Sequence, residues 1–254
     1  MADTIAVLSL KGGTGKTTTV RTLADAFRRA GLDVLAVDLD PQGNLSDYFD
    51  VPPDATPTIA DVLAGHAKVK HAGHEGIVPA TPILAEVERS LSGKMGRELI
   101  LRKALKDARK AHDILLIDCP PALGLLTVNG LVAADWALIS SEAQYFALQG
   151  VQGALEVIEQ AREFYNPELE WLGVLMNIAD MRTVHSRDAY AQLKEHFGDK
   201  VFETVIRSSI AYAESAEKAM SILDYRPDLG EDYLTLAREV LARIGRVDAE
   251  RALQ

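Results

Sequence analysis

Residues 11–18 read Lys-Gly-Gly-Thr-Gly-Lys-Thr-Thr and combine glycines, hydroxyls and amines in one short stretch. Glycine permits backbone angles that other residues avoid, which lets successive amides of such a turn converge on phosphate oxygens. Lys16 would then reach the β- and γ-phosphates of a nucleotide, and the Thr17 hydroxyl would ligate Mg²⁺. These residue types at this spacing predict a nucleotide phosphate site.

Acidic residues follow two short apolar runs. Residues 34–37 lead into Asp38 and Asp40, and residues 114–117 lead into Asp118. The carboxyl ends of parallel strands share one edge of a sheet where ligands bind, so these acids are expected beside the glycine-rich turn. A Mg²⁺–triphosphate needs negative partners, and Asp118 is expected to act on the metal directly or through a water. For Asp38, capping a turn is an equally good interpretation.

The elements that must position these residues are short apolar runs alternating with longer amphipathic stretches, the pattern of a parallel sheet covered by helices. Several runs are apolar at consecutive positions, as expected for strands buried on both faces. The expected strands are 5–8, 34–37, 114–117, 137–139, 173–176 and 201–205. The expected helices are 16–30, 97–111, 151–165, 187–197 and 232–244.

The predicted fold is therefore α/β of the P-loop NTPase type, a mostly parallel twisted sheet with helices on both faces. Gly31 is expected to end the first helix in the left-handed conformation. Residues 50–57, which hold three prolines, and residues 65–76 are expected to be irregular. The sheet pattern resumes after both, so residues 1–254 are expected to form a single domain.

Composition narrows the function classes. Of 254 residues, 48% are hydrophobic and 25% charged, enough for a sizeable core without a disulfide or a metal. The one cysteine, Cys119, has no visible base partner and is expected to be a packed thiol. Neither a membrane-spanning run nor a secretory signal is visible, so a cytoplasmic location is expected. At a net charge of −10, binding to nucleic acid would need a local basic patch.

Residues 11–18 resemble the deviant P-loop of the ParA/MinD family, which carries an additional signature lysine at the position of Lys11. The general P-loop pattern has a glycine where this chain has Leu10, and that departure is informative in this context. Further stretches are similar to the ParA/Soj branch, so the resemblance covers most of the chain. These stretches are residues 118–127, 145–150, 180–183 and 196–202.

The resemblance implies an ATPase that works as a dimerisation switch. Two monomers would sandwich two ATP molecules with Mg²⁺, and Lys11 of each subunit would reach the phosphates held by the other, like an arginine finger supplied in trans. Asp40 would position the attacking water, so the implied catalytic residues are Lys11, Lys16 and Asp40. The implied metal residues are Thr17, Asp40 and Asp118.

The same resemblance implies weak basal hydrolysis, stimulated by a ParB-like protein or a cargo adaptor, in a cycle that partitions or positions DNA or a protein cargo. Asn177 follows a strand end where related ATPases place an adenine-reading asparagine, and a buried or turn-forming asparagine is the competing interpretation. The residues expected to bind the nucleotide are Lys11, Gly12, Gly13, Thr14, Gly15, Lys16, Thr17, Thr18 and Asn177.

The C-terminal third departs from the family pattern. The arginines with which Soj-like proteins hold DNA would fall near Ala211 and at residues 228–229, which are not basic here. Arg207, Lys218 and Arg226 could rebuild a basic patch or form an ordinary solvated surface. Phosphate neutralisation supplies essentially all non-specific affinity for DNA, so DNA binding and association with the nucleoid stay open.

Two other functions are compatible with the motifs. One is a MinD-type division-site regulator that cycles on a membrane; the chain end around Arg246, Asp248 and Glu250 lacks the lysines and bulky apolar residues of such an anchor. The other is a P-loop enzyme that transfers phosphate to a small molecule. His66, His71 and His74 lack a completing carboxylate or cysteine and are expected to lie in a surface loop rather than at a metal.

Overall fold

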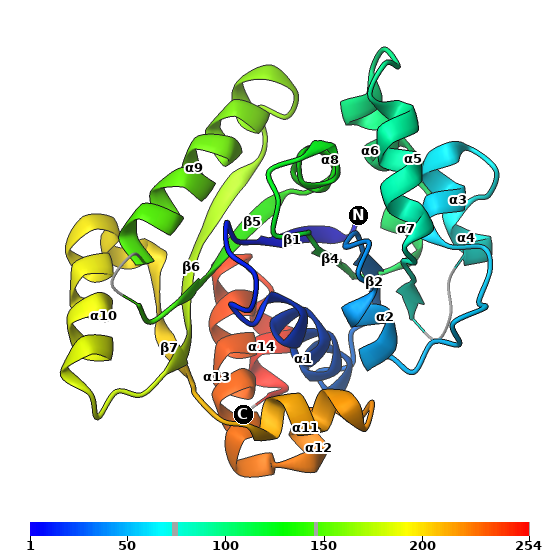
Figure 1. Cartoon of the computed structure of the whole chain (residues 1–254). Helices are drawn as coiled ribbons and strands as arrows, with labels where there is room; N and C mark the ends of the chain where they lie inside the picture. The colour runs from blue at the N-terminus through cyan, green and yellow to red at the C-terminus, as the bar shows by residue number, and fades with distance from the viewer. Residues whose placement is uncertain (73–75, 145–146, 254) are drawn as a thin grey trace.

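The structure is a computed structural model that describes residues 1–72, 76–144 and 147–253 (Figure 1). The strands of these residues form one seven-stranded sheet in the order β3-β2-β4-β1-β5-β6-β7, and every neighbouring pair is parallel. This confirms the predicted α/β class. The strands are β1 (Asp3–Leu8), β2 (Val34–Asp38), β3 (Ile77–Val78), β4 (Ile114–Asp118), β5 (Trp136–Glu142), β6 (Glu170–Ala179) and β7 (Val201–Arg207).

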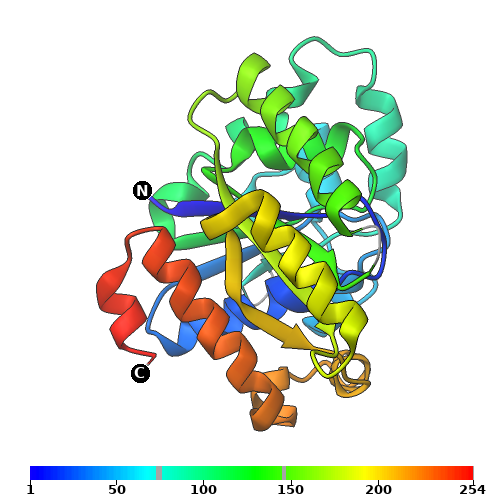
Figure 2. The same ribbon diagram turned by 90° about the vertical axis from the view of Figure 1, so that its left-hand side faces the viewer.

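Each face of the sheet carries its own apolar core, because successive side chains of a strand point to opposite faces. In β1, Ile5 and Val7 join one core, whereas Ala6 and Leu8 join the other. Figure 1 shows helices on both sides of the sheet, with α1 (Lys16–Arg29) and α13 (Pro227–Arg243) on the side opposite α8 (Leu125–Ala133) and α9 (Ala147–Phe164). The edge strand β7 lies between α10 (Val184–Phe197) and α13 (Figure 2).

The helices that pack on the side of Ile5 are α1 (Lys16–Arg29), α2 (Asn44–Tyr48), α11 (Ala211–Glu217), α12 (Ile222–Tyr225) and α13 (Pro227–Arg243), and α14 (Val247–Arg251) contacts α13. The other face carries α3 (Ile59–Ala64), α5 (Ile83–Leu91), α6 (Ile100–Ala104), α7 (Ala108–Ala111), α8 (Leu125–Ala133), α9 (Ala147–Phe164) and α10 (Val184–Phe197). The remaining short helices are α4 (Val69–Ala72), η1 (Arg97–Leu99) and η2 (Gly198–Lys200).

The expected helix over residues 97–111 is wrong as one element, because the chain forms η1, α6 and α7 there. The cause of the break between η1 and α6 is Asn129 of α8. Its Nδ2 donates to the Arg97 carbonyl at 2.9 Å, and its Oδ1 accepts from the Leu101 amide at 3.1 Å. Those two backbone groups are an i to i+4 pair that would bond to each other in a continuous α-helix. The Asn129 carboxamide therefore takes the place of one helical bond.

Other boundaries differ by a few residues. Helix α10 begins at Val184 rather than residue 187, because the Thr183 hydroxyl accepts from the Ser186 amide and caps it. Gly31 has a φ of +80° directly after α1, as predicted. Strand β3 and helix α8 had no counterpart among the predicted elements. Strand β3 spans only two residues, and α8 is buried along nearly all its length, so neither shows a periodic pattern.

Among the described residues, no helix combines the length and the apolar character that crossing a membrane requires.

Candidate functional site

The glycine-rich turn lies between the carboxyl end of β1 and the start of α1, in the predicted strand–turn–helix order. Gly13 and Gly15 have φ values of +77° and +81°, which side-chain-bearing residues rarely adopt. The first turn of α1 carries no acidic residue, so its free amides and positive dipole end face the turn without competition. The arrangement can bind phosphate groups.

Lys16 is held inside the turn by Ser9. The Lys16 side chain is buried, with 7% of the residue exposed, and its Nζ lies 3.1 Å from Ser9 Oγ. Ser9 Oγ also accepts from Thr14 Oγ1 at 2.9 Å and donates to the Lys11 carbonyl at 2.7 Å. Sequence reasoning did not single out Ser9. The available signal was a hydroxyl residue between the end of an apolar strand and the motif.

Thr17 and Asp118 are in direct contact, although 101 residues separate them. Thr17 Oγ1 donates to Asp118 Oδ2 at 2.7 Å, whereas Asp118 Oδ1 is buried and has no hydrogen-bond partner among the described residues. Burial and the neighbouring charge of Asp38, its partner in the β2–β4 register, raise the pKa of Asp118. A buried carboxylate oxygen without a partner, beside a hydroxyl, fits the ligand preferences of Mg²⁺.

Asp38 organises the loop that carries Asp40. Its carboxylate accepts the amide and the hydroxyl of Ser46 at 2.9 and 2.8 Å, and the Asp40 amide at 3.0 Å. Burial raises the pKa of Asp38 despite these bonds. Of the two interpretations of Asp38, the structure favours the turn-forming one, since its oxygens are occupied by the loop.

Asp40 is half-buried and lines the same pocket as Lys16 and Thr17. Its Oδ1 accepts the Gln42 amide at 3.0 Å. Within the described residues Asp40 makes no hydrogen bond to Thr17 or Asp118. This position suits a carboxylate that contacts a water in the pocket better than one that joins Asp118 as a metal ligand.

Asn177 of β6 is buried behind the turn. Its Nδ2 donates to Thr19 Oγ1 at 3.1 Å and to Ser140 Oγ at 2.8 Å, so the amide group supports the start of α1. A Cβ placed on Gly15 would lie 3.2 Å from the Asn177 side chain, which explains a second need for glycine at that position. Asn177 also borders the pocket, so both interpretations of this residue stay compatible with its place.

The turn opens into a pocket of about 620 Å³. Its lining combines residues 12–18 and Asp40 with residues for which the sequence predicted no part in nucleotide binding: Ile178, Ile206, Arg207, Ser209, Tyr212 and Tyr233. A bond of 2.6 Å between Tyr48 Oη and Ser215 Oγ joins α2 to α11, and Tyr48 also lines the pocket. The phosphate end is thus polar and the far end is largely apolar and aromatic, as a nucleotide requires.

Lys11 lies outside the pocket wall. Its Nζ contacts Glu142 Oε2 at 2.9 Å and Gln144 Oε1 at 2.6 Å. Glu142 is the last residue of β5, and Gln144 follows it closely. The Lys11 side chain remains 61% exposed. Lys11 therefore does not face the phosphate cradle of its own chain.

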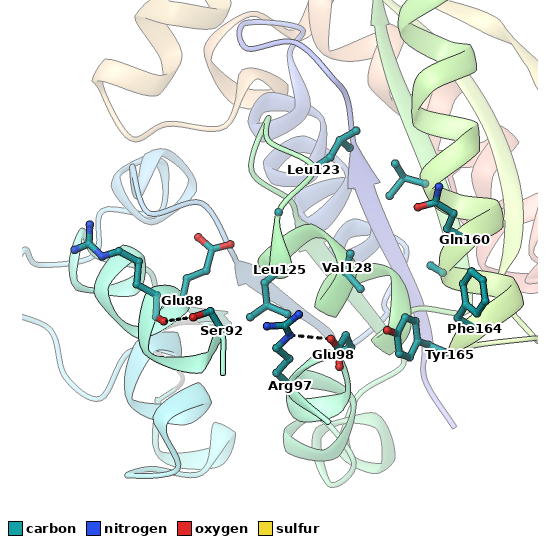
Figure 3. A pocket seen from close by; sticks show the side chains of 14 residues that line it. Glu88, Ser92, Arg97, Glu98, Leu123, Leu125, Val128, Gln160, Phe164 and Tyr165 are labelled. Carbon is teal, nitrogen blue, oxygen red and sulfur yellow. Dashed lines mark hydrogen bonds and ion pairs between the residues drawn. The ribbon is translucent and has the colours of Figure 1, made fainter. Parts of the chain in front are cut away.

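A second hollow of about 540 Å³ lies between α5, α8 and α9 (Figure 3). Glu88 Oε1 accepts the Leu126 amide there at 3.3 Å, and Arg97 pairs with Glu98 at 2.9 Å. None of its lining residues belongs to the glycine-rich turn or to the acids that follow β2 and β4. It is a separate depression, rimmed by the exposed Phe164 side chain.

The three C-terminal cations do not form a free basic patch. Arg207 pairs with Asp232 at 2.7 Å, Arg226 pairs with Asp228 at 2.8 Å, and Lys218 donates to Tyr225 Oη at 3.0 Å. The charges of Arg207 and Arg226 are therefore compensated by ion pairs, whereas Lys218 is bonded to a neutral hydroxyl.

The remaining sequence predictions have mixed outcomes. Cys119 is fully buried against Gly130, as expected of a packed thiol, and burial raises its pKa. His66 is exposed, whereas His74 and the side chain of His71 lie outside the described residues, as do residues 145–146 of one resembling stretch. The part of the chain that the structure describes contains no group of three or more His, Cys, Asp or Glu residues arranged to hold a metal.

Comparisons with known proteins agree with this geometry. A family model described as AAA domain (AAA_31) matches residues 2–171. The chromosome-partitioning ATPase Soj of Thermus thermophilus is 39% identical, covering 94% of this chain and 96% of that protein.

Two solved structures are similar over the whole fold. Cobyrinic acid a,c-diamide synthase from Mycobacterium smegmatis, with bound ADP and magnesium, is 36% identical with a TM-score of 0.77, covering 86% of this chain and 92% of that one. The septum site-determining protein MinD from Pyrococcus horikoshii, complexed with Mg-ADP, is 25% identical with a TM-score of 0.79, covering 97% and 99%.

Proposed function

The chain belongs to the ParA/MinD family of P-loop ATPases, near its Soj branch, and on this premise we propose that it is an ATP-hydrolysing dimerisation switch that partitions or positions DNA or a protein cargo. The observation that carries the proposal is the phosphate cradle of Gly13, Gly15 and Lys16 beside the Thr17–Asp118 contact. Similar proteins solved with Mg-ADP support the choice of nucleotide.

The residues of the turn hold the nucleotide. The amides of residues 12–18 bind the phosphates, and Lys16 exchanges its bond to Ser9 for phosphate oxygens. The base lies toward the apolar wall that includes Ile206 and Tyr212. Asn177 supports the turn from behind through Thr19 and Ser140.

Thr17 and Asp118 are the residues that would hold Mg²⁺, because Asp118 Oδ1 is buried beside the Thr17 hydroxyl and has no hydrogen-bond partner among the described residues. When bound, Mg²⁺ neutralises charge on the β- and γ-phosphates. Asp40 orients the attacking water. The loop that carries Asp40 is held in place by Asp38, whose carboxylate accepts the Asp40 amide. Hydrolysis by orienting one water is slow without a partner, so basal activity is expected to be weak.

Lys11 acts in the partner subunit rather than in its own. Its side chain lies outside its own cradle and is largely exposed, where a second copy can meet it. A cation delivered across the dimer neutralises charge that develops in the transition state. Each Lys11 can reach phosphates only in the other subunit. The bound nucleotide therefore controls whether two subunits form a dimer.

Size-exclusion chromatography with and without ATP and Mg²⁺ tests this proposal. The unmodified chain is expected to elute as a dimer only with ATP and Mg²⁺, and Lys11→Ala is expected to stay monomeric. Lys94→Ala, which removes an exposed lysine elsewhere, is the matched control and should behave as the unmodified chain. Identical monomers for all three proteins would remove the basis for a role of Lys11 in trans.

Assays of ATP turnover and of vesicle binding on the same proteins separate the alternatives. The similarity to the Mycobacterium smegmatis synthase supports a small-molecule enzyme as an alternative. Such an enzyme would turn over ATP as a monomer and only with its acceptor present. A membrane-cycling regulator would dimerise with ATP and then bind vesicles.

Glu142 is expected to oppose dimerisation because it holds Lys11 on its own chain. An exposed ion pair contributes about 0.2–1 kcal/mol and each dimer would release two of them, so Glu142→Ala should tighten the ATP-bound dimer roughly 2- to 30-fold. Analytical ultracentrifugation at several protein concentrations measures this change. Glu156→Ala, an exposed acid on α9, should leave the dimer constant unchanged. A weaker dimer for Glu142→Ala would show that Glu142 contacts the partner instead.

A further inference from the structure

One buried hydrogen bond connects the base end of the nucleotide pocket to the segment that carries Asp40. Tyr48 Oη lies 2.6 Å from Ser215 Oγ, although 167 residues separate the two. Tyr48 is the last residue of α2, and Ser215 belongs to α11. The two helices contact each other below α1 in Figure 1. The bond therefore joins two distant segments of the chain at one pocket.

Both hydroxyl groups of this bond are removed from water. Tyr48 is 1% exposed, and Ser215 is fully buried. Ser215 Oγ also donates to the Tyr212 carbonyl at 2.9 Å, so Tyr48 supplies the proton of the shared bond. A buried hydroxyl without a partner costs free energy. The bond therefore resists any separation of α2 from α11.

Helix α11 belongs to the end of the pocket to which the nucleotide base is assigned. Tyr212, Ala213 and Ala216 of this helix line the pocket. The Tyr212 ring packs edge-on against the Tyr233 ring, with ring centroids 5.9 Å apart. A base in this end of the pocket therefore contacts the same helix that carries Ser215.

Helix α2 is anchored near both of its ends. Near its start, the Ser46 amide and hydroxyl donate to Asp38, whose carboxylate also accepts the Asp40 amide. At its end, the Tyr48 side chain is bonded to α11, and Arg21 Nη1 of α1 donates to the Tyr48 carbonyl at 2.7 Å. Asp40 shares its anchor with α2, so its position depends on where α2 is held.

On the premise of the proposed function, we propose that Tyr48 is a positioning residue that couples the filling of the base end of the pocket to the placement of Asp40. The coupling passes from the base to α11, through Ser215 to Tyr48, and along α2 to the loop of Asp40. Tyr48 acts through Asp40, because its own hydroxyl is engaged by Ser215. A nucleotide therefore orders the water-orienting carboxylate better than its phosphates alone do.

Hydrogen–deuterium exchange of the full chain tests this coupling without relying on catalysis. The ligands are ADP and pyrophosphate, each at saturation with Mg²⁺, because ADP adds the ribose and the base to the same pair of phosphates. Both should slow exchange at residues 11–18 of the unmodified chain. At residues 39–48, ADP should slow exchange roughly 2- to 12-fold more than pyrophosphate, the factor that corresponds to one net hydrogen bond.

Three variants locate the coupling. Tyr48→Phe keeps the ring and loses the hydroxyl, so ADP and pyrophosphate should protect residues 39–48 of this variant equally. Ser215→Ala removes the acceptor from α11 and should give the same result. Tyr190→Phe is the matched control, because it removes a hydroxyl that donates to the Phe202 carbonyl and does not line the pocket. This control should keep the full advantage of ADP.

Turnover at saturating ATP shows whether the ordering reaches Asp40. It should fall by the same roughly 2- to 12-fold in Tyr48→Phe and stay unchanged in Tyr190→Phe. A loss of stability alone would lower turnover without removing the difference between ADP and pyrophosphate at residues 39–48. Turnover of Tyr48→Phe equal to that of the unmodified chain would overturn the positioning role.

The exchange results also separate this inference from the proposed function. If ADP did not protect residues 11–18, both would be overturned. Protection of residues 11–18 with equal effects of ADP and pyrophosphate on residues 39–48 of the unmodified chain would overturn the coupling alone. The coupling would also fail if Tyr48→Phe and Ser215→Ala kept the advantage of ADP, or if Tyr190→Phe lost it to the same extent as they do.

Discussion

Asp40→Ala is expected to bind ATP as tightly as the unmodified chain and to hydrolyse it at least ~100-fold more slowly. The variant loses the carboxylate that orients water but keeps the cradle, Lys16 and the Thr17–Asp118 pair. Binding without turnover leaves the dimer trapped in its ATP state. A coupled phosphate-release assay and size-exclusion chromatography after long incubation with ATP and Mg²⁺ measure both effects.

Asp47→Ala is the matched control for this variant. Asp47 lines the same pocket and carries the same charge, but it is exposed on α2. If charge near the phosphates were all that mattered, the two variants would slow hydrolysis equally. Normal turnover by Asp40→Ala would dismiss the role given to Asp40, and loss of ATP binding would make it a ligand of the nucleotide or its metal instead.

The sequence was most informative where structure depends on neighbouring residues. The turn at Gly13 and Gly15, the start of α1 at Lys16 and its end before Gly31 follow from local backbone chemistry. The parallel sheet then follows from apolar runs buried on both faces. For these turns, helix ends and strands, the order of residue types in the sequence was enough to predict the structure.

Contacts between distant residues were beyond the sequence. Asn129 interrupts the helix over residues 97–111 from α8, and Glu142 holds Lys11 across 131 residues. Lys11 and Glu142 are both visible in the sequence, but their contact is not, because the fold brings them together. The same limit applied to the aromatic wall of the pocket, which comes from the chain after β6.

Residues 94–110, which hold seven lysines and arginines against two acids, show a second limit of prediction from sequence. Their amphipathic pattern predicted helical structure, and that pattern also describes an ordinary solvated face. Only the fold shows that Arg102, Lys103 and Lys106 line one hollow without ion-pair partners among the described residues, while Arg207 and Arg226 are ion-paired. Charge availability, rather than charge count, distinguishes the two regions.

Asp118→Asn is expected to stabilise the nucleotide-free chain while abolishing its stabilisation by ATP and Mg²⁺. The folded pKa of Asp118 is raised, so the stability linked to its protonation is present below the unfolded value and is lost as pH rises through the folded pKa. Near pH 8 the folded chain holds a buried charge next to Asp38, which asparagine removes. A gain of about 1–3 kcal/mol is expected, or roughly 2–12 °C in Tm.

Differential scanning fluorimetry across pH, with and without ligand, measures both effects. The Tm advantage of Asp118→Asn should grow from about pH 5 to pH 8, and Asp38 should keep a smaller pH dependence in the variant because burial raises its pKa as well. At 100 times Kd, ATP and Mg²⁺ should stabilise the unmodified chain by about 2.7 kcal/mol and the variant hardly at all. The order of stability therefore reverses when ligand is added. A variant less stable than the unmodified chain at pH 8 without ligand would show that Asp118 has a structural role and does not wait for a cation.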